Sequence, residues 1–97
     1  MENTSNLTII RVHVHITGKV QGVGFRYYCT QQAQNLGLKG WVRNLSDGRV
    51  EGVFEGDRSQ IKSILDWCHQ GPSSSVVKDV TIEYEEPEGL KDFIIKR

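Results

Sequence analysis

Between residues 10 and 17 apolar and polar side chains alternate strictly, in the order Ile, Arg, Val, His, Val, His, Ile and Thr. A period of two places alternate side chains on opposite faces of a β-strand, so one face of this segment is apolar and the other is polar. Such a strand suits an antiparallel sheet that is covered on one face only. The rest of the chain must therefore supply the cover for the face formed by Ile10, Val12, Val14 and Ile16.

Two later segments have the spacing of helices with a single apolar stripe. The first begins near Phe25 and ends at Gly37, because glycine is favoured just beyond a helix. The second begins at Asp57, which with Gln60 has the spacing of a capping box, and it stops at Gly71-Pro72. The stripes consist of Phe25, Cys29, Ala33 and Leu36 in the first helix and Ile61, Ile64, Leu65 and Cys68 in the second.

The remaining patterned segments read as strands. Leu38–Asn44 and Arg49–Glu55 are joined by a four-residue turn with hairpin chemistry, Leu-Ser-Asp-Gly. Alternation at Val80, Ile82 and Tyr84 predicts a further strand, and Phe93–Lys96 a short last one. The order β-α-β-β-α-β with a short terminal strand predicts an α+β fold. We expect a ferredoxin-like two-layer sandwich, with two helices on one face of a mostly antiparallel sheet.

Length and charge limit the classes of function. The 97 residues suffice for one domain, which we place at 7–97 after a flexible polar arm at 1–6. Twelve basic and twelve acidic residues cancel, which argues against nucleic-acid or anionic-membrane partners. No apolar run approaches the roughly 20 residues that span a bilayer, and the N-terminal segment lacks a signal-type apolar block. These features predict a cytoplasmic protein, and nothing in the sequence calls for an obligate partner, so we expect a monomer.

The two cysteines, Cys29 and Cys68, are too few and too far apart for a disulfide framework or a zinc knuckle. Both fall on apolar stripes, where a free cysteine acts as a small core residue. A bridge between the two helices stays open as the less favoured reading, because a reducing compartment opposes it.

A glycine-rich segment, residues 18–26, leads from the first strand into the first helix. Glycines let the backbone curl so that successive N–H groups face one point, and a helix N-terminus adds unpaired donors that favour an anion. Arg26 stands in the first helical turn, where a cation opposes the helix dipole unless an anion binds between them. The segment lacks the Gly-Lys-Ser/Thr ending of nucleoside triphosphatases and the third glycine of dinucleotide folds. On this pattern alone a phosphate loop and a plain turn are both open.

Asn44 ends an otherwise apolar strand, a position that asparagine rarely occupies. Its side chain could start the following turn by bonding the backbone near Asp47, which is the more common arrangement. Alternatively its amide could orient a water molecule, although an amide cannot remove a proton near neutral pH.

His13 and His15 lie two residues apart on one face of the first strand, a spacing that metal sites sometimes use. No carboxylate or cysteine beside them in the sequence completes a ligand set. We therefore expect a solvent-facing pair and no metal site.

Two blocks of the sequence resemble the signatures of the acylphosphatase family. The first is Gly18-Lys19-Val20-Gln21-Gly22-Val23-Gly24-Phe25-Arg26. The second is Gly40-Trp41-Val42-Arg43-Asn44 followed by Gly48, Val50 and Gly56, and Gly71-Pro72 also fits the family's pattern. The resemblance runs from the first strand to Arg97 and leaves out only the polar arm.

This resemblance implies an activity and a site. Members of the family hydrolyse the carboxyl–phosphate bond of small acyl phosphates to a carboxylate and inorganic phosphate, and they need no cofactor. By resemblance, Arg26 binds the phosphate together with the backbone amides of the loop, and Asn44 positions the attacking water. The implied phosphate-binding residues are Gln21, Gly22, Val23, Gly24, Phe25 and Arg26, the implied catalytic residues are Arg26 and Asn44, and no metal is implied.

Two other readings stay open. A non-catalytic ferredoxin-like binding or regulatory module would use the same sheet, but RNA-binding versions carry exposed aromatics among basic residues on the central strands. Here those strands offer histidines and glutamates instead. The second reading is an acylphosphatase-type domain that serves a larger carbamoyl-transfer protein.

Overall fold

A computed structural model describes residues 8–97, so the predicted arm at 1–6 lies outside the described residues. The elements follow the predicted order of strands and helices. They are β1 (Ile10–Lys19), α1 (Phe25–Asn35), β2 (Lys39–Asn44), β3 (Val50–Gly56), α2 (Arg58–Gln70), β4 (Val76–Glu85) and β5 (Phe93–Ile95).

The strands form one five-stranded sheet in the spatial order β4-β1-β3-β2-β5. β1 lies between β3 and β4 and is antiparallel to both, and β2 is antiparallel to β3. The short β5 adds to the outer edge of β2 in parallel. The sheet is therefore mostly antiparallel, as the sequence predicts.

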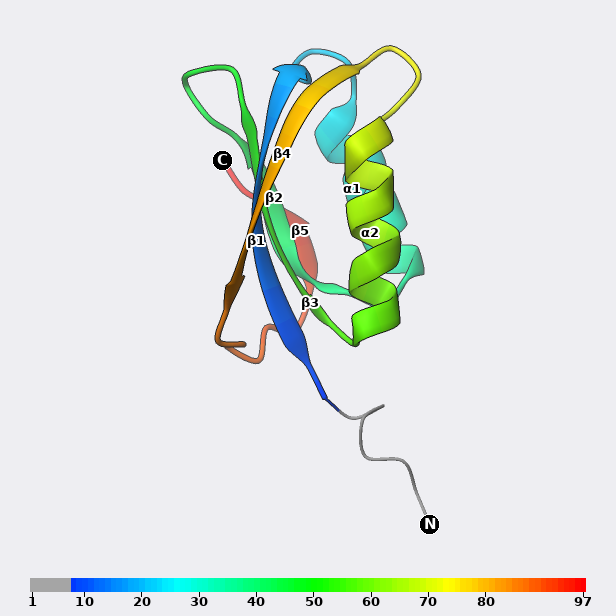
Figure 1. The fold of residues 1–97 in the computed structure, drawn as a ribbon, viewed down its shortest axis with the longest axis vertical. Coiled ribbons are helices and arrows are strands. Elements are labelled where there is room, and N and C mark those ends of the chain that lie inside the picture. The colour runs from blue at the N-terminus through cyan, green and yellow to red at the C-terminus, as the bar shows by residue number, and fades with distance from the viewer. Residues whose placement is uncertain (1–7) are drawn as a thin grey trace.

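Both helices pack on the same face of the sheet and leave the other face bare (Figure 1). The core lies between these two layers, because the apolar side chains of β1 and the helix stripes meet there. Val12, Val14 and Ile16 are fully buried, while Ile10 is half-buried at the margin of the core. The predicted inward face of the first strand and the α+β two-layer sandwich are confirmed.

The helix ends follow the predicted local chemistry. Asp57 caps α2 by accepting from the backbone N–H of Gln60, whose side chain accepts from the backbone N–H of Asp57. Beyond α1, Gly37 takes the left-handed conformation that closes a helix.

The strand β4 begins earlier than its sequence alternation indicates. Alternation is visible only from Val80 onward, whereas the strand starts at Val76. The pairing of β1 with β4 shifts register between Thr17 and Gly18, and such a bulge breaks the period of two. A membrane-spanning helix, for which length and apolar character would both be needed, is absent from residues 8–97.

Candidate active site

The loop between β1 and α1 is shaped by two glycines in the left-handed region. Gly22 has a φ of 75° and Gly24 a φ of 82°. Side chains other than glycine adopt this conformation at a cost of roughly 1–2 kcal/mol per residue, so the loop depends on these glycines. Gly24 is also the N-cap residue of α1, and the helix starts directly after it at Phe25.

The N-terminus of α1 is left without the usual side-chain partners. Gly24 supplies no capping side chain, and the first turn of α1 contains no acidic residue. Arg26 lies in that turn, half-buried, and makes no ion pair with any residue in the described range 8–97. Unpaired N–H groups and an unpaired guanidinium therefore meet at one place, which suits an anion with several oxygens.

A pocket of about 280 Å³ opens at this helix end. It brings Arg26 and Asn44 together with Gly22, Gly24 and Phe25, all of which the resemblance implicated. Gln21 and Val23 belong to the same loop but do not line the pocket. The lining consists of Val20, Gly22, Gly24, Phe25, Arg26, Tyr27, Asn44, Ile95 and Arg97.

Asn44 enters the pocket from the end of β2. Its Oδ1 is buried and has no hydrogen-bond partner among the described residues. The following turn is closed by other groups: the backbone N–H of Leu45 donates to the Arg49 carbonyl at 2.8 Å, and Asp47 Oδ1 accepts from the Arg49 N–H at 3.1 Å. The turn-starting alternative is therefore wrong for this oxygen. A buried acceptor without a partner is rare and calls for a ligand or a water.

Gln21 has a role that the sequence did not reveal. Its Nε2 donates to the carbonyl of Leu45 at 2.7 Å and to the carbonyl of Arg49 at 2.9 Å. This side chain ties the glycine loop to the turn that follows Asn44. Only the spatial closeness of the two segments identifies this contact, because Gln21 and Leu45 are 24 positions apart in the sequence.

The pocket wall also includes residues that sequence reasoning missed. Ile95 comes from β5, which reaches the pocket because it pairs in parallel with β2, and Arg97 follows that strand. Tyr27 is an exposed residue of the first turn of α1. The alternation pattern gives no indication of which strand β5 pairs with.

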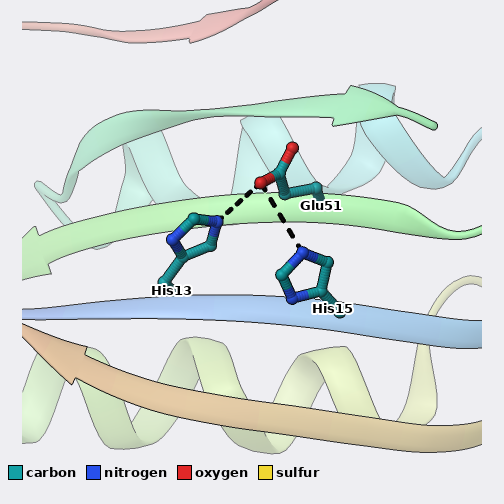
Figure 2. A group of neighbouring side chains, drawn as sticks. All are labelled: His13, His15 and Glu51. Carbon is teal, nitrogen blue, oxygen red and sulfur yellow. Dashed lines mark hydrogen bonds and ion pairs between the residues drawn. The ribbon is translucent and has the colours of Figure 1, made fainter.

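The bare face of the sheet corrects the expectation for His13 and His15. Both rings are only partly exposed, at 20% and 24%, and stack with centroids 5.1 Å apart. A carboxylate does lie beside them, because the register of β1 and β3 places Glu51 opposite His15. Glu51 Oε2 is 2.6 Å from His13 Nε2 and 3.6 Å from His15 Nε2 (Figure 2). The premise that no carboxylate is near was wrong, since it rested on sequence neighbours alone.

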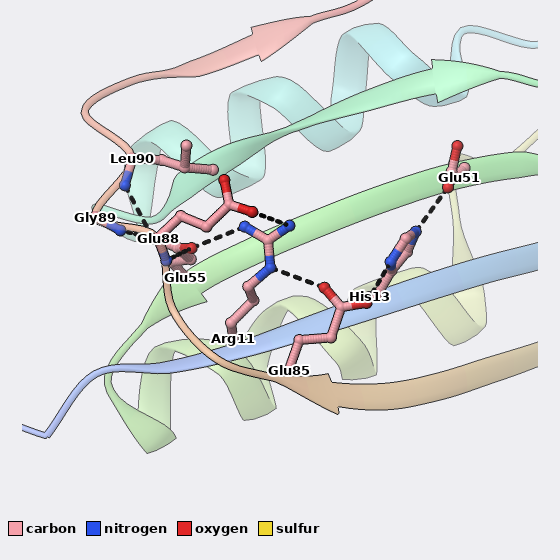
Figure 3. Close-up of polar contacts among 8 residues, drawn as sticks. All are labelled: Arg11, His13, Glu51, Glu55, Glu85, Glu88, Gly89 and Leu90. Carbon is pink, nitrogen blue, oxygen red and sulfur yellow. Dashed lines mark hydrogen bonds and ion pairs between the residues drawn. The ribbon is translucent and has the colours of Figure 1, made fainter.

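An ion-pair network extends from this group along the bare face, buried at Arg11 and Glu55 and exposed at Glu88 (Figure 3). Arg11 lies at its centre and pairs with Glu55 and Glu85, each at 2.9 Å, and with Glu88 at 3.6 Å. The acidic stretch near the C-terminus therefore supplies two partners for a buried arginine, Glu85 and Glu88. Glu55 also accepts hydrogen bonds from the backbone N–H groups of residues 88–90.

These contacts shift several pKa values on the bare face. Burial opposes the charge of Glu55, but the Glu88 backbone N–H and the Arg11 guanidinium outweigh it and lower the pKa of the carboxyl. Burial likewise opposes the charge of Glu51, and His13 and Arg43 outweigh it to lower the pKa of that carboxyl. For His13, the carboxylates of Glu51 and Glu85 outweigh burial and raise the pKa of the imidazole. In all three groups the shift favours the charged form.

The chemistry available in the pocket is limited to binding and orientation. No histidine, cysteine, serine or carboxylate is among the residues that line it. The side chains of the pocket therefore offer two guanidinium cations, Arg26 and Arg97, and the neutral amide of Asn44 beside the backbone donors, but no titratable base near neutral pH. Such a set can stabilise the charge of a phosphoryl group and hold a water against it.

Comparisons with known proteins identify the family of the chain. A family model described as Acylphosphatase matches residues 12–95. An acylphosphatase of Trichormus variabilis is 59% identical over 95 residues, which cover 98% of this chain and 94% of that protein. The solved structure of an acylphosphatase from Coxiella burnetii superposes with a TM-score of 0.89 at 39% identity, covering 93% of this chain and 95% of the other.

A larger protein contains a similar unit. The structure of T. kodakarensis HypF matches with a TM-score of 0.80 at 30% identity, and the match covers 91% of this chain but 12% of that one. The reading as an unrelated regulatory module fails, because the family match spans the loop, the helix and the strand that line the pocket. The chain belongs to the acylphosphatase family of enzymes.

Proposed function

We propose that the protein hydrolyses the carboxyl–phosphate bond of small acyl phosphates in this pocket. Arg26 and the backbone amides of residues 21–26 hold the phosphoryl oxygens, and Asn44 orients the attacking water. The pocket has an anion-favouring wall and a neutral acceptor facing the same space, which is the arrangement this reaction needs.

The observation that carries the proposal is the buried, unpartnered Oδ1 of Asn44 in the pocket that Arg26 lines. Leaving a buried acceptor unpaired costs roughly 1–3 kcal/mol, so its retention needs an explanation. A water that donates to this oxygen satisfies it and is thereby fixed in direction. The amide neither gains nor loses a proton near neutral pH, so it orients the water at any working pH.

The reaction proceeds by transfer of the phosphoryl group to water. The bond between phosphorus and the carboxyl oxygen breaks, and its electron pair leaves with the carboxylate. The water oxygen forms the new bond to phosphorus and then loses a proton to solvent, which gives inorganic phosphate. In the loose transition state charge spreads over the three phosphoryl oxygens, where Arg26 and the amides stabilise it.

The demands of this reaction match the residue types in the pocket. A carboxylate is a weak base, so it leaves without a general acid. Bond formation to water lags behind bond breaking, so a strong general base is not needed either. Because positioning and charge stabilisation suffice, we expect the reaction to run without a metal ion or other cofactor.

We also propose that the protein works as a monomer in the cytoplasm, without nucleic acid or membrane as a partner. Cys29 and Cys68 fit this compartment as two buried free thiols. Balanced charge supports the lack of a nucleic-acid partner.

The test is the hydrolysis of benzoyl phosphate in the presence of EDTA, followed by release of carboxylate and phosphate. We expect rapid hydrolysis by the native protein and a loss of about 10³-fold in kcat for Arg26→Ala. Asn44→Ala should lower kcat by about 10²-fold, because the water is no longer held in line.

Matched controls separate these effects from general damage. Arg58→Ala removes the arginine in the first turn of the other helix, and Asn35→Ala removes an exposed asparagine at the end of α1. Both controls should retain full activity. Activity that survives Arg26→Ala refutes the site, and no hydrolysis by a well-folded native protein refutes the reaction.

A further inference from the structure

We infer that His13, His15 and Glu51 form a binding site for a divalent transition-metal ion such as Zn²⁺. The site lies on the bare face of the sheet and shares no residue with the phosphate pocket. Two imidazoles and one carboxylate form a donor set that zinc accepts, with a fourth position left for water.

The sheet places the three ligands together. His13 and His15 are two residues apart on β1, so their side chains leave the same face of the sheet. Glu51 stands directly opposite His15 on β3. Because two strands supply the ligands and their register is fixed by the buried core, the arrangement does not depend on a mobile loop.

The distances fit a tetrahedral ion after small side-chain rotations. One ring nitrogen of His13, one ring nitrogen of His15 and a carboxylate oxygen of Glu51 all lie within 4.8 Å of one another. Ligand bonds of about 2.0–2.1 Å place the ligand atoms of a tetrahedral zinc roughly 3.3 Å apart. The present separations from Glu51 Oε2, 2.6 Å for His13 and 3.6 Å for His15, bracket that value.

Neighbouring side chains orient two of the ligands. Glu85 Oε2 lies 2.8 Å from His13 Nδ1, so it can hold the ring proton there and leave Nε2 free to ligate (Figure 3). Arg43 Nε donates to Glu51 Oε1 at 2.6 Å, which leaves Oε2 turned toward the histidines. A carboxylate behind a ligating histidine is the usual second partner in zinc sites, and losing such a partner costs about 10- to 100-fold in affinity.

The local charge also favours a cation. The ion-paired groups around the site comprise two arginines and four glutamates, which leaves a net charge of −2 when the histidines are neutral. A divalent ion balances that charge. The groups are Arg11, Arg43, Glu51, Glu55, Glu85 and Glu88.

The experiment is calorimetric titration of the tag-free, EDTA-stripped protein with ZnCl₂ at pH 8, because metal ions compete with protons for their ligands and bind better at higher pH. We expect one ion per chain and a melting temperature that rises on the order of 10 °C at a hundredfold excess of zinc over Kd. His15→Gln should weaken binding at least about 100-fold, because it removes a ligand outright. His69→Gln is the matched control, since this remaining histidine lies on α2 and bonds the Leu65 carbonyl.

A measurement on the native protein alone guards against a variant that fails to fold. In proton NMR, zinc should shift the ring signals of His13 and His15 and leave those of His69 in place. The Co²⁺-loaded protein should show visible bands without a thiolate charge-transfer band, which separates this site from binding by the cysteines. The proposal is overturned by an absence of stoichiometric binding, by equal affinity in His15→Gln, or by a thiolate band.

Discussion

At the scale of single residues, the glycine loop owes its shape to a backbone conformation that only glycine adopts without strain. Gly22 has a φ of 75°, and an added Cβ there would meet nothing within 4 Å. An alanine at this position is therefore sterically free but conformationally strained. A substitution at Gly22 therefore measures the free-energy cost of backbone strain without a contribution from steric clashes.

Gly22→Ala should lower the free energy of unfolding by roughly 1–2 kcal/mol through this strain. It should also weaken inhibition by inorganic phosphate about tenfold, because turning one N–H out of line loses about 1.4 kcal/mol. Urea unfolding and inhibition kinetics measure the two effects.

Gly89→Ala is the matched control, with a φ of 77° and equally open space, far from the pocket lining. It should lose similar stability and keep its phosphate inhibition. Equal inhibition in both variants would show that the conformation of Gly22 does not shape the phosphate site.

At the scale of elements, the pocket lined by Arg26 and Asn44 lies between two segments that belong to different elements. Arg26 is fixed by α1 and Asn44 by β2, and the Gln21 side chain bonds the loop before α1 to the turn after β2. Gln21 therefore links the segment that precedes Arg26 to the turn that follows Asn44.

Gln21→Glu should lower both stability and turnover, because a carboxylate cannot donate to two carbonyls. We expect a loss of about 1–3 kcal/mol in the free energy of unfolding and a drop in kcat that exceeds any change in KM. Gln32→Glu, an exposed change of the same charge on α1, is the control for the added charge. If the two variants have the same kcat, Gln21 does not position the site.

Much of this arrangement could be predicted from local patterns. The start of α1 at Phe25, the capping box at Asp57 and the turn after Asn44 follow from residues close in sequence, and the structure agrees with each. Arg26 and Asn44 were both implicated in advance, through the family resemblance, and both line the pocket.

The parts that could not be predicted all depend on which strands meet. The parallel pairing of β5 with β2 brings Ile95 to the pocket, and the register of β1 with β3 brings Glu51 to the histidines. Register is set by the whole buried face rather than by any short segment. For the same reason the sequence did not indicate that Arg11 pairs with Glu55 across the strands.

At the scale of the whole molecule, the ion-pair network around Arg11 makes the free energy of unfolding depend on pH in the acid range. Glu55 on β3 is 2% exposed. Three charged residues from other segments face it: Arg11 of β1, Glu88 of the segment after β4, and Lys39, which is opposite Glu55 on β2. The pKa of Glu55 is lowered in the folded protein, so its ionised form stabilises the fold above the ordinary carboxyl pKa of about 4.3. That contribution is lost as the pH falls through the lower, folded-state pKa.

Glu55→Gln should therefore reduce the free energy of unfolding at pH 7 by on the order of 3 kcal/mol, since it leaves Arg11 short of a buried partner. The difference from the native protein should shrink as the pH falls below about 4.3, where the carboxyl of the unfolded chain takes up a proton, and vanish below the lower pKa of the folded state. Denaturant unfolding across a pH series measures this. Glu86→Gln, an exposed change nearby, should show a small and constant effect, and a constant effect for Glu55→Gln would contradict the linkage.

The reactivity of the two cysteine thiols measures global unfolding of the protein. Cys29 and Cys68 are fully buried on different helices, and the hydrogen bond with Cys68, together with burial, raises the pKa of the Cys29 thiol. Both thiols should resist Ellman's reagent in the folded protein and react together at the rate of global unfolding. Rapid reaction of either thiol without denaturant would show that the helices separate locally.

The edge position of β4 has a consequence for the behaviour of concentrated protein. β4 is ten residues long and pairs only with β1, so its outer side presents free backbone groups to other copies of the chain. Lys78, Asp79, Glu83 and Glu85 lie along this edge and discourage a second strand from joining it. Acid removes three of these four charges and leaves exposed Val76 and Tyr84 behind. Aggregation should therefore begin along this edge at low pH.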